Sequence, residues 1–84
     1  MTPLVEALDA LGLNGEIELA GRWVRLAGER CAVYIVEAAW GTGYYTWCDD
    51  ERERAVQLYR DPATAIRAGL ARAACGAEED EAHD

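Results

Sequence analysis

The segment from Cys31 to Ala38 restricts the fold of this chain most, because a strand formed by it would carry apolar side chains on both of its faces. Alternation places Cys31, Val33 and Ile35 on one face, and Ala32, Tyr34 and Val36 on the other. An antiparallel strand with one wet face would instead alternate apolar and polar residues. The segment therefore predicts a central strand that is covered on both sides for at least part of its length.

Other short segments on both sides of it are typical of neighbouring strands. Residues 44–48 follow a glycine-containing turn, and residues 55–60 alternate Val56 and Leu58 with polar positions. Residues 16–19 alternate as well, until Gly21 breaks the pattern and 23–26 resume it in a shifted phase. This break predicts either one bulged strand over 16–26 or a tight hairpin of two very short strands, and we favour the bulged strand.

Two helices are predicted at the ends of the domain. The first spans about residues 3–11, because Thr2 can cap it, Pro3 suits its first position and leucines recur at helical spacing. The second begins with the same signal at Asp61-Pro62 and ends at Gly76. The order α-β-β-β-β-α predicts one α+β domain over 1–76, an antiparallel meander of three or four strands with both helices on one face.

The net charge restricts the kinds of partner that this protein can bind, and the cysteine content indicates its cellular compartment. The formal charge of −8 argues against nucleic acid and anionic membranes as partners, and five of the 16 acids lie in 77–84, which we expect to be a disordered acidic tail. Three cysteines without a C-x-x-C pair, and a start without signal-peptide features, predict a cytoplasmic protein. Arginine without any lysine is typical of a GC-rich, bacterial genome.

The amino acid composition excludes most classes of catalytic mechanism. The chain has no Ser and no Lys, which excludes a serine triad, a Schiff-base enzyme and a phosphate-binding lysine loop. Its one histidine, His83, is in the acidic tail, so a Cys-His pair cannot be held rigidly, and no zinc-ligand spacing occurs. We therefore predict a protein that is not an enzyme, with no catalytic residues, no metal and no cofactor.

One acidic run is a weak candidate for a cation site. Residues 49–53 hold four acids in five positions, whose oxygens suit Mg²⁺ or Ca²⁺. The run lacks the glycine and the alternate acidic positions of a calcium loop. A solvated turn between two strands is the interpretation we favour.

Aromatic residues are the one positive functional signal. All seven lie on or beside the predicted sheet, at Trp23, Tyr34, Trp40, Tyr44, Tyr45, Trp47 and Tyr59. Two small helices cover only one face of such a sheet, so the other face would carry Trp and Tyr with Arg25 or Gln57 among them. These residue types are enriched at binding hot spots.

We accordingly predict a non-enzymatic protein-interaction module, a homodimer or a complex with an unknown protein. Its partner-binding residues are predicted to be Trp23, Arg25, Tyr45, Trp47 and Tyr59. The competing interpretation is that the rings fill a core that is short of Leu and Phe.

A second hypothesis is a small-molecule binder or minor enzyme with a pocket near Glu37, Trp40 and Tyr44. Glu37 ends the apolar strand next to Ala38 and Ala39. Such surroundings would favour the protonated carboxyl that a general acid requires. A strand-end carboxylate that points to water or pairs with an arginine is the interpretation we favour.

Overall fold

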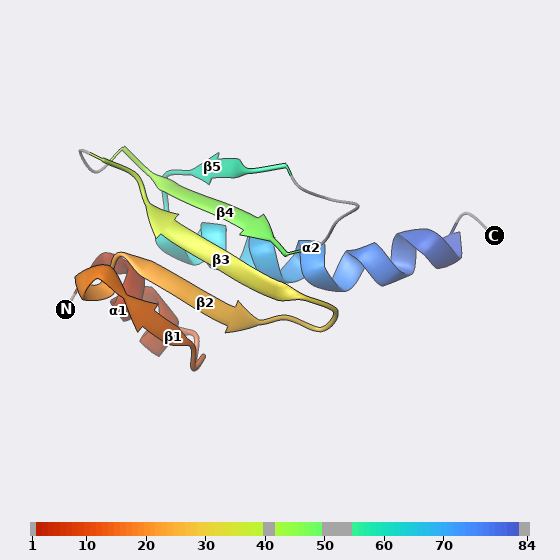
Figure 1. Cartoon of the computed structure of the whole chain (residues 1–84), viewed down its shortest axis with the longest axis horizontal. Helices are drawn as coiled ribbons and strands as arrows, with labels where there is room; N and C mark the ends of the chain where they lie inside the picture. The colour runs from red at the N-terminus through yellow and green to blue at the C-terminus, as the bar shows by residue number, and fades with distance from the viewer. Residues whose placement is uncertain (1, 40–41, 50–54, 83–84) are drawn as a thin grey trace.

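A computed structural model describes residues 2–39, 42–49 and 55–82 of the chain. Helix α1 (Pro3–Ala10) precedes the strands and helix α2 (Pro62–Ala82) follows them. The strands form one antiparallel meander in the order β1-β2-β3-β4-β5 (Figure 1). Their bounds are Glu16–Glu18, Trp23–Ala27, Ala32–Glu37, Tyr44–Cys48 and Gln57–Tyr59. The predicted α+β domain is confirmed, with five strands in place of three or four.

The fifth strand arises at the break in residues 16–26, where the favoured bulged strand is wrong and the hairpin is right. A 3₁₀ turn, η1 (Leu19–Gly21), reverses the chain so that Glu18 pairs with Trp23. Leu19, Ala20 and Gly21 have φ of 53°, 57° and 88°. Left-handed backbone costs roughly 1–2 kcal/mol for a residue other than glycine, so a Leu-Ala pair gives no sequence signal for this reversal.

The N-terminal helix holds this turn in place. The Thr2 hydroxyl donates to the Gly21 carbonyl at 2.6 Å and accepts from the Val5 amide at 3.3 Å, so one side chain caps α1 and fastens η1 to it. Gly21 is buried against the same residues: a Cβ there would lie 2.8 Å from the Thr2 hydroxyl oxygen.

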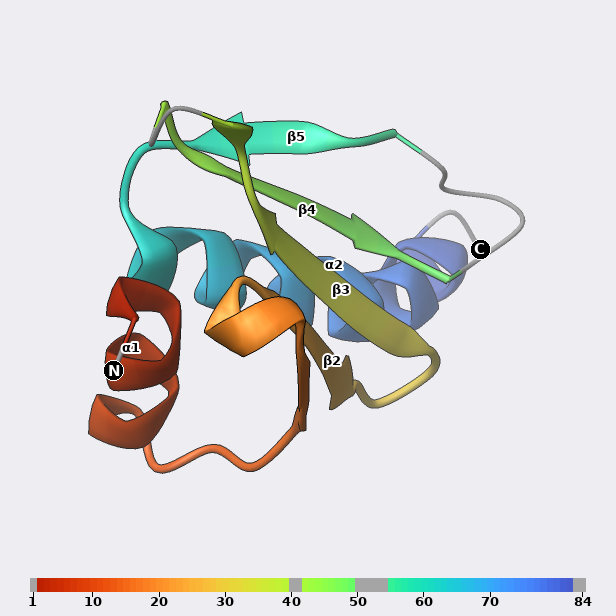
Figure 2. The same ribbon diagram turned by 60° about the vertical axis from the view of Figure 1, so that its left-hand side comes forward.

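The hydrophobic core lies between the helices and one face of the sheet (Figure 2). Val24, Val33 and Ile35 are fully buried there, together with Leu4 of α1 and Ile66 of α2. β3 is the central strand, as its composition predicts. Cover on its second face is not present: within the described residues no helix or strand lies over Tyr34 and Val36, which are half-buried by neighbouring side chains alone.

Helix α2 approaches the sheet closely at Gly69. A Cβ at that position would lie 2.5 Å from both the Thr46 hydroxyl oxygen and a Val33 methyl. The Cys48 thiol donates to the Gly69 carbonyl at 3.4 Å across the same contact. The buried Thr46 hydroxyl has no hydrogen-bond partner among the described residues. Small residues at this contact let the helix cover one face of β3 and β4.

Both ends of α2 bear on the sequence predictions. Its start is capped as predicted: the Asp61 carboxylate accepts from the Thr64 amide at 2.9 Å and from the Thr64 hydroxyl at 3.0 Å. These bonds lower the pKa of Asp61. The helix continues past Gly76, its predicted end, to Ala82. Alanine and glutamate are good helix formers and one interior glycine costs only about 1 kcal/mol, so Gly76 does not stop the helix.

Candidate functional site

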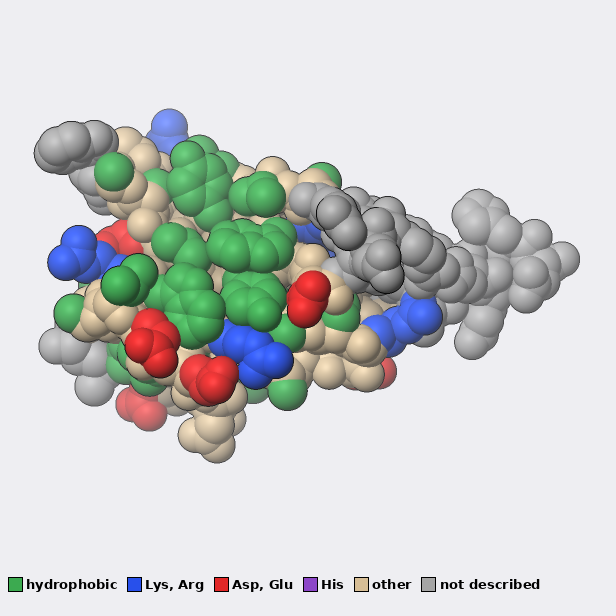
Figure 3. All heavy atoms as spheres, viewed as in Figure 1, with side chains coloured by type: hydrophobic (Ala, Val, Ile, Leu, Met, Phe, Trp, Pro, Cys, Tyr) green, Lys and Arg blue, Asp and Glu red, His purple; other side chains and the backbone are tan. Residues whose placement is uncertain are grey.

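The face of the sheet that turns away from both helices carries a continuous apolar surface, which we call the aromatic face (Figures 1 and 3). Pairing register places its members on alternate positions of β2, β3, β4 and β5. They are Trp23, Arg25, Tyr34, Val36, Tyr45, Trp47 and Leu58. Hydrophobic side chains gather over the middle strands in Figure 3, and charged ones border them toward β1.

Three rings form a row across the middle of this face. The ring centroids of Tyr34 and Trp47 are 5.3 Å apart with planes inclined by 15°, so these two rings stack. Trp23 meets Tyr34 on the other side at 5.8 Å in a tilted arrangement. Aromatic pairs at such separations contribute about 0.5–1.5 kcal/mol beyond their burial. The row is therefore held in a fixed arrangement by contacts within the face itself.

Arg25 is built into the same row. Its guanidinium lies 5.9 Å from the Tyr34 ring centroid, and its Nε donates to the Tyr34 hydroxyl at 3.3 Å. Its Nη1 donates to a Glu16 carboxylate oxygen at 3.2 Å. The hydrogen bond that Arg25 donates to Tyr34 and the negative charge of Glu16 raise the pKa of Arg25. These contacts place a permanent cation between the aromatic row and the acidic side chain of Glu16.

The two edges of the aromatic face differ in character. Toward β5, Tyr45, Leu58 and Val56 are 42%, 52% and 57% exposed, so three apolar side chains are open to solvent at this edge. Toward β1, the register places Glu16 and Glu18 on the face. One edge is thus apolar and open, and the other is acidic.

Four of the five predicted partner-binding residues come together here: Trp23, Arg25, Tyr45 and Trp47. Tyr59 does not join them. It pairs with Tyr44 in the sheet register, so it points to the helix side, where its hydroxyl donates to Gln57 at 2.6 Å. Alternation correctly separates Leu58 from Tyr59, but it does not decide which of them shares a face with Trp47; only the β4–β5 register does.

The sequence does not predict three members of this face as part of the site. Its pattern places Tyr34 and Val36 on the second face of the central strand, which it predicts to be covered. It gives Leu58 a face of its strand but no role. The doubly apolar pattern of 31–38 was the available signal for Tyr34 and Val36, since a central strand with one helix layer leaves its other face open.

The residues of the alternative hypothesis are placed as follows. Trp40 lies outside the described residues. Glu37 and Tyr44 are register partners on β3 and β4. Burial raises the pKa of Tyr44, and the nearby carboxylates of Glu37 and Asp61 raise it further, because all three disfavour a phenolate.

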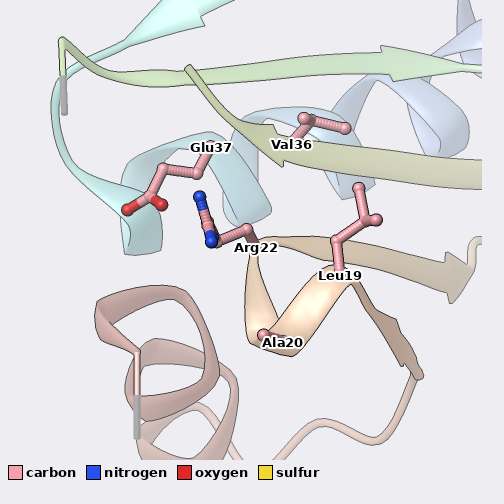
Figure 4. Close-up of a pocket in the computed structure, with 5 residues that line it drawn as sticks. All are labelled: Leu19, Ala20, Arg22, Val36 and Glu37. Atoms are coloured by element: carbon pink, nitrogen blue, oxygen red, sulfur yellow. The ribbon is translucent and has the colours of Figure 1, made fainter. Parts of the chain in front are cut away.

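A surface pocket does occur at this end of the sheet, although Tyr44 is not among its walls. It measures about 410 Å³ and is lined by Leu19, Ala20, Arg22, Val36 and Glu37 (Figure 4). Of the two described residues in the predicted pocket, Glu37 and Tyr44, this pocket includes Glu37.

Other classes of site find little support. Within residues 2–39, 42–49 and 55–82, no cluster of His, Cys, Asp and Glu side chains could hold a metal ion. Most of the acidic run, residues 50–53, lies outside the described residues. Nor does the part of the chain that the structure describes hold a helix long and apolar enough to span a membrane. No protein-family model, curated protein or solved structure matches this chain.

Proposed function

We propose that this protein is a non-enzymatic interaction module that associates with a second copy of itself through the aromatic face. One observation carries the proposal: the row Trp23–Tyr34–Trp47 lies on the side of the sheet away from both helices. An antiparallel sheet that faces water normally presents polar side chains on that side. Here the side chains are instead of the types that concentrate at protein interfaces.

A second copy is favoured as the partner because the aromatic face is self-complementary. Arg25, Tyr34 and Trp47 share one register row across β2, β3 and β4. If two sheets stack face to face with a twofold axis along β3, β2 of one copy lies over β4 of the other. Arg25 then faces Trp47 of the second copy, and a cation over an indole ring is an attractive pair.

The size of the face sets the expected strength of the association. Three central strands of five or six residues and two edge strands of three residues, about 4.8 Å apart, give a face of at most roughly 20 Å by 16 Å, or about 320 Å² in projection. Standard specific interfaces bury about 800 Å² on each partner, so this face is well below that size and fits a weak association. The dimer is accordingly proposed to be reversible, with monomer and dimer both present at micromolar concentrations.

Sedimentation equilibrium over a wide concentration range tests this proposal. The wild-type chain is expected to show a monomer–dimer equilibrium. Trp47→Ala removes a central ring, and its dimer dissociation constant should rise tenfold or more, since a buried aromatic anchor contributes about 2 kcal/mol or more. Arg25→Gln should weaken the dimer as well, because it removes the cation but keeps a side chain of similar length.

Ile17→Ala is the matched control. Ile17 is 46% exposed, but its register partner is Val24, so it lies on the side of the sheet away from the aromatic face. Its removal should leave the dissociation constant unchanged. A wild-type chain that stays monomeric throughout the range, or a Trp47→Ala chain that dimerises as the wild type does, would refute self-association. A heterologous protein partner would then be the function to test.

A further inference from the structure

The pocket between η1 and the end of β3 has walls of two kinds. Leu19 rises toward Val36 on one side and makes an apolar wall (Figure 4). Arg22 and Glu37 line the other side, with the small side chain of Ala20 below. The volume of about 410 Å³ lies in the range of small-molecule sites, about 300–1,000 Å³.

The two charged residues are cross-strand neighbours that do not pair. The Glu37 amide donates to the Arg22 carbonyl at 2.8 Å, which continues the β2–β3 register by one position. Opposite charges at such positions normally attract each other into a direct contact. No ion pair joins these two described side chains, however, whereas Arg25 and Glu16 do form one between β2 and β1. A guanidinium and a carboxylate thus line the same pocket with their charges available to a ligand.

The turn between β1 and β2 builds the apolar wall of the pocket. Leu19 and Ala20 both line the pocket and both have positive φ, which is the backbone that tight hairpin turns use at their central residues. Leu19 is 68% exposed, so its side chain is not part of the core. The turn thus presents an apolar side chain to the pocket.

We propose that this pocket binds a small zwitterion, an α-amino acid with an aliphatic side chain. Arg22 receives its carboxylate, Glu37 receives its ammonium group, and the side chain lies between Leu19 and Val36. This site shares Val36 with the aromatic face, but it contains none of Arg25, Tyr34 and Trp47, on which the proposed dimer contact centres.

Titration of the ¹⁵N-labelled chain with L-leucine, followed by amide chemical shifts, tests the proposal. Saturable shifts are expected at residues 19–22 and 36–37 within about 10 mM ligand, since a small ligand with two charge contacts and one apolar contact binds in the millimolar range or better. N-acetyl-L-leucine lacks the ammonium group and L-leucinamide lacks the carboxylate. Each should bind tenfold or more weakly, because a charged hydrogen bond is lost.

Conservative variants locate the two contacts. Glu37→Gln should weaken the binding of leucine but leave the binding of N-acetyl-L-leucine unchanged, because that derivative has no ammonium group. Arg22→Gln should likewise weaken the binding of leucine but leave the binding of L-leucinamide unchanged, because that derivative has no carboxylate. Glu6→Gln and Arg60→Gln are matched controls on exposed positions outside the pocket. The Trp47→Ala chain should bind leucine as the wild type does, which separates this site from dimer formation. Shifts that do not saturate, or equal binding of leucine and both derivatives, would overturn the proposal.

Discussion

The two faces of the sheet are both apolar, yet they are built from different kinds of side chain. The helix-covered face carries aliphatic residues such as Val24, Val33 and Ile35, all fully buried. The aromatic face carries Trp23, Tyr34 and Trp47, which contact one another sideways across the strands. β3 contributes to both faces, so the difference is imposed from one residue to the next along the same strand.

The comparison shows that side-chain size, more than hydropathy, separates a face that receives a helix from one that does not. α2 comes close enough at Gly69 that a Cβ would touch Val33 and Thr46, and only small residues allow that approach. Large rings on the other face hold neighbours apart but partly cover each other. They keep a flat apolar surface in place without a second layer above it.

The largest expected effect comes from deleting volume on the covered face. Ile35→Ala removes a fully buried side chain from the central strand, and the free energy of unfolding should fall by about 2–5 kcal/mol. Tyr45→Ala removes a larger side chain from the aromatic face, but 42% of it is already exposed. Its effect should stay within about 1 kcal/mol. Chemical denaturation of both variants at a concentration that keeps the chain monomeric measures the difference. Equal losses would erase the distinction between the faces.

Gly69→Ala tests the close approach of α2. The added methyl group would lie 2.5 Å from Val33 and Thr46, so the helix must move outward. Overpacking of this kind costs about 1–3 kcal/mol, which exceeds the gain of about 1 kcal/mol in helix propensity. The unfolding free energy should therefore fall. Val33→Ala should cost less in the Gly69→Ala chain than in the wild type, because it makes room for the methyl group; additive losses would contradict the contact.

Much of this fold was predictable from local signals. Thr2-Pro3 and Asp61-Pro62 mark the starts of both helices, because capping is a local event between residues three positions apart. The central strand was predictable from its double apolar pattern. The hairpin at η1 was not, because Leu19 and Ala20 take left-handed backbone that neither residue favours, and the distant Thr2 holds the turn.

The candidate site was predictable in its composition but not in its limits. Alternation alone places Trp23 with Arg25 on β2 and Tyr45 with Trp47 on β4. The β2–β3–β4 register then brings the two pairs to the same face. Tyr59 was misplaced because its face depends on the pairing of β5 with β4 across a connection whose length does not fix the register. The pocket at Arg22 and Glu37 forms beside the turn at η1. Since the sequence does not predict that turn, it does not predict the pocket either.

Thr46→Val tests a polar atom on the covered face. Its hydroxyl is fully buried and, among the described residues, has no hydrogen-bond partner. An unsatisfied buried polar group destabilises by about 1–3 kcal/mol, so a methyl group in its place should raise the unfolding free energy by about 1 kcal/mol. Thr42→Val is the control, since that hydroxyl is exposed and donates to the Ala39 carbonyl at 3.1 Å. It should change stability by no more than about 0.5 kcal/mol.

The smallest expected effect is the pH dependence of stability that comes from Asp61, the N-terminal cap of α2, the helix that covers one face of the sheet. The hydrogen bonds from Thr64 hold the pKa of Asp61 below its ordinary value of 3.8, so the folded state favours the carboxylate. Its contribution to stability is fully present above pH 3.8 and is lost as the pH falls through the lower folded pKa. Asp61→Asn keeps a side-chain oxygen at the cap but does not ionise.

Unfolding free energies of the wild type and Asp61→Asn, measured from neutral pH down to about pH 2, isolate this contribution. All other acids are common to both chains, so the difference between the two curves reports Asp61 alone. The difference should be constant above pH 3.8 and should shrink below it. If it grows as the pH falls, the carboxylate is not the favoured form in the folded state. If it is flat throughout, α2 covers its face of the sheet without help from this charge, and the contrast between the two faces depends on side-chain size alone.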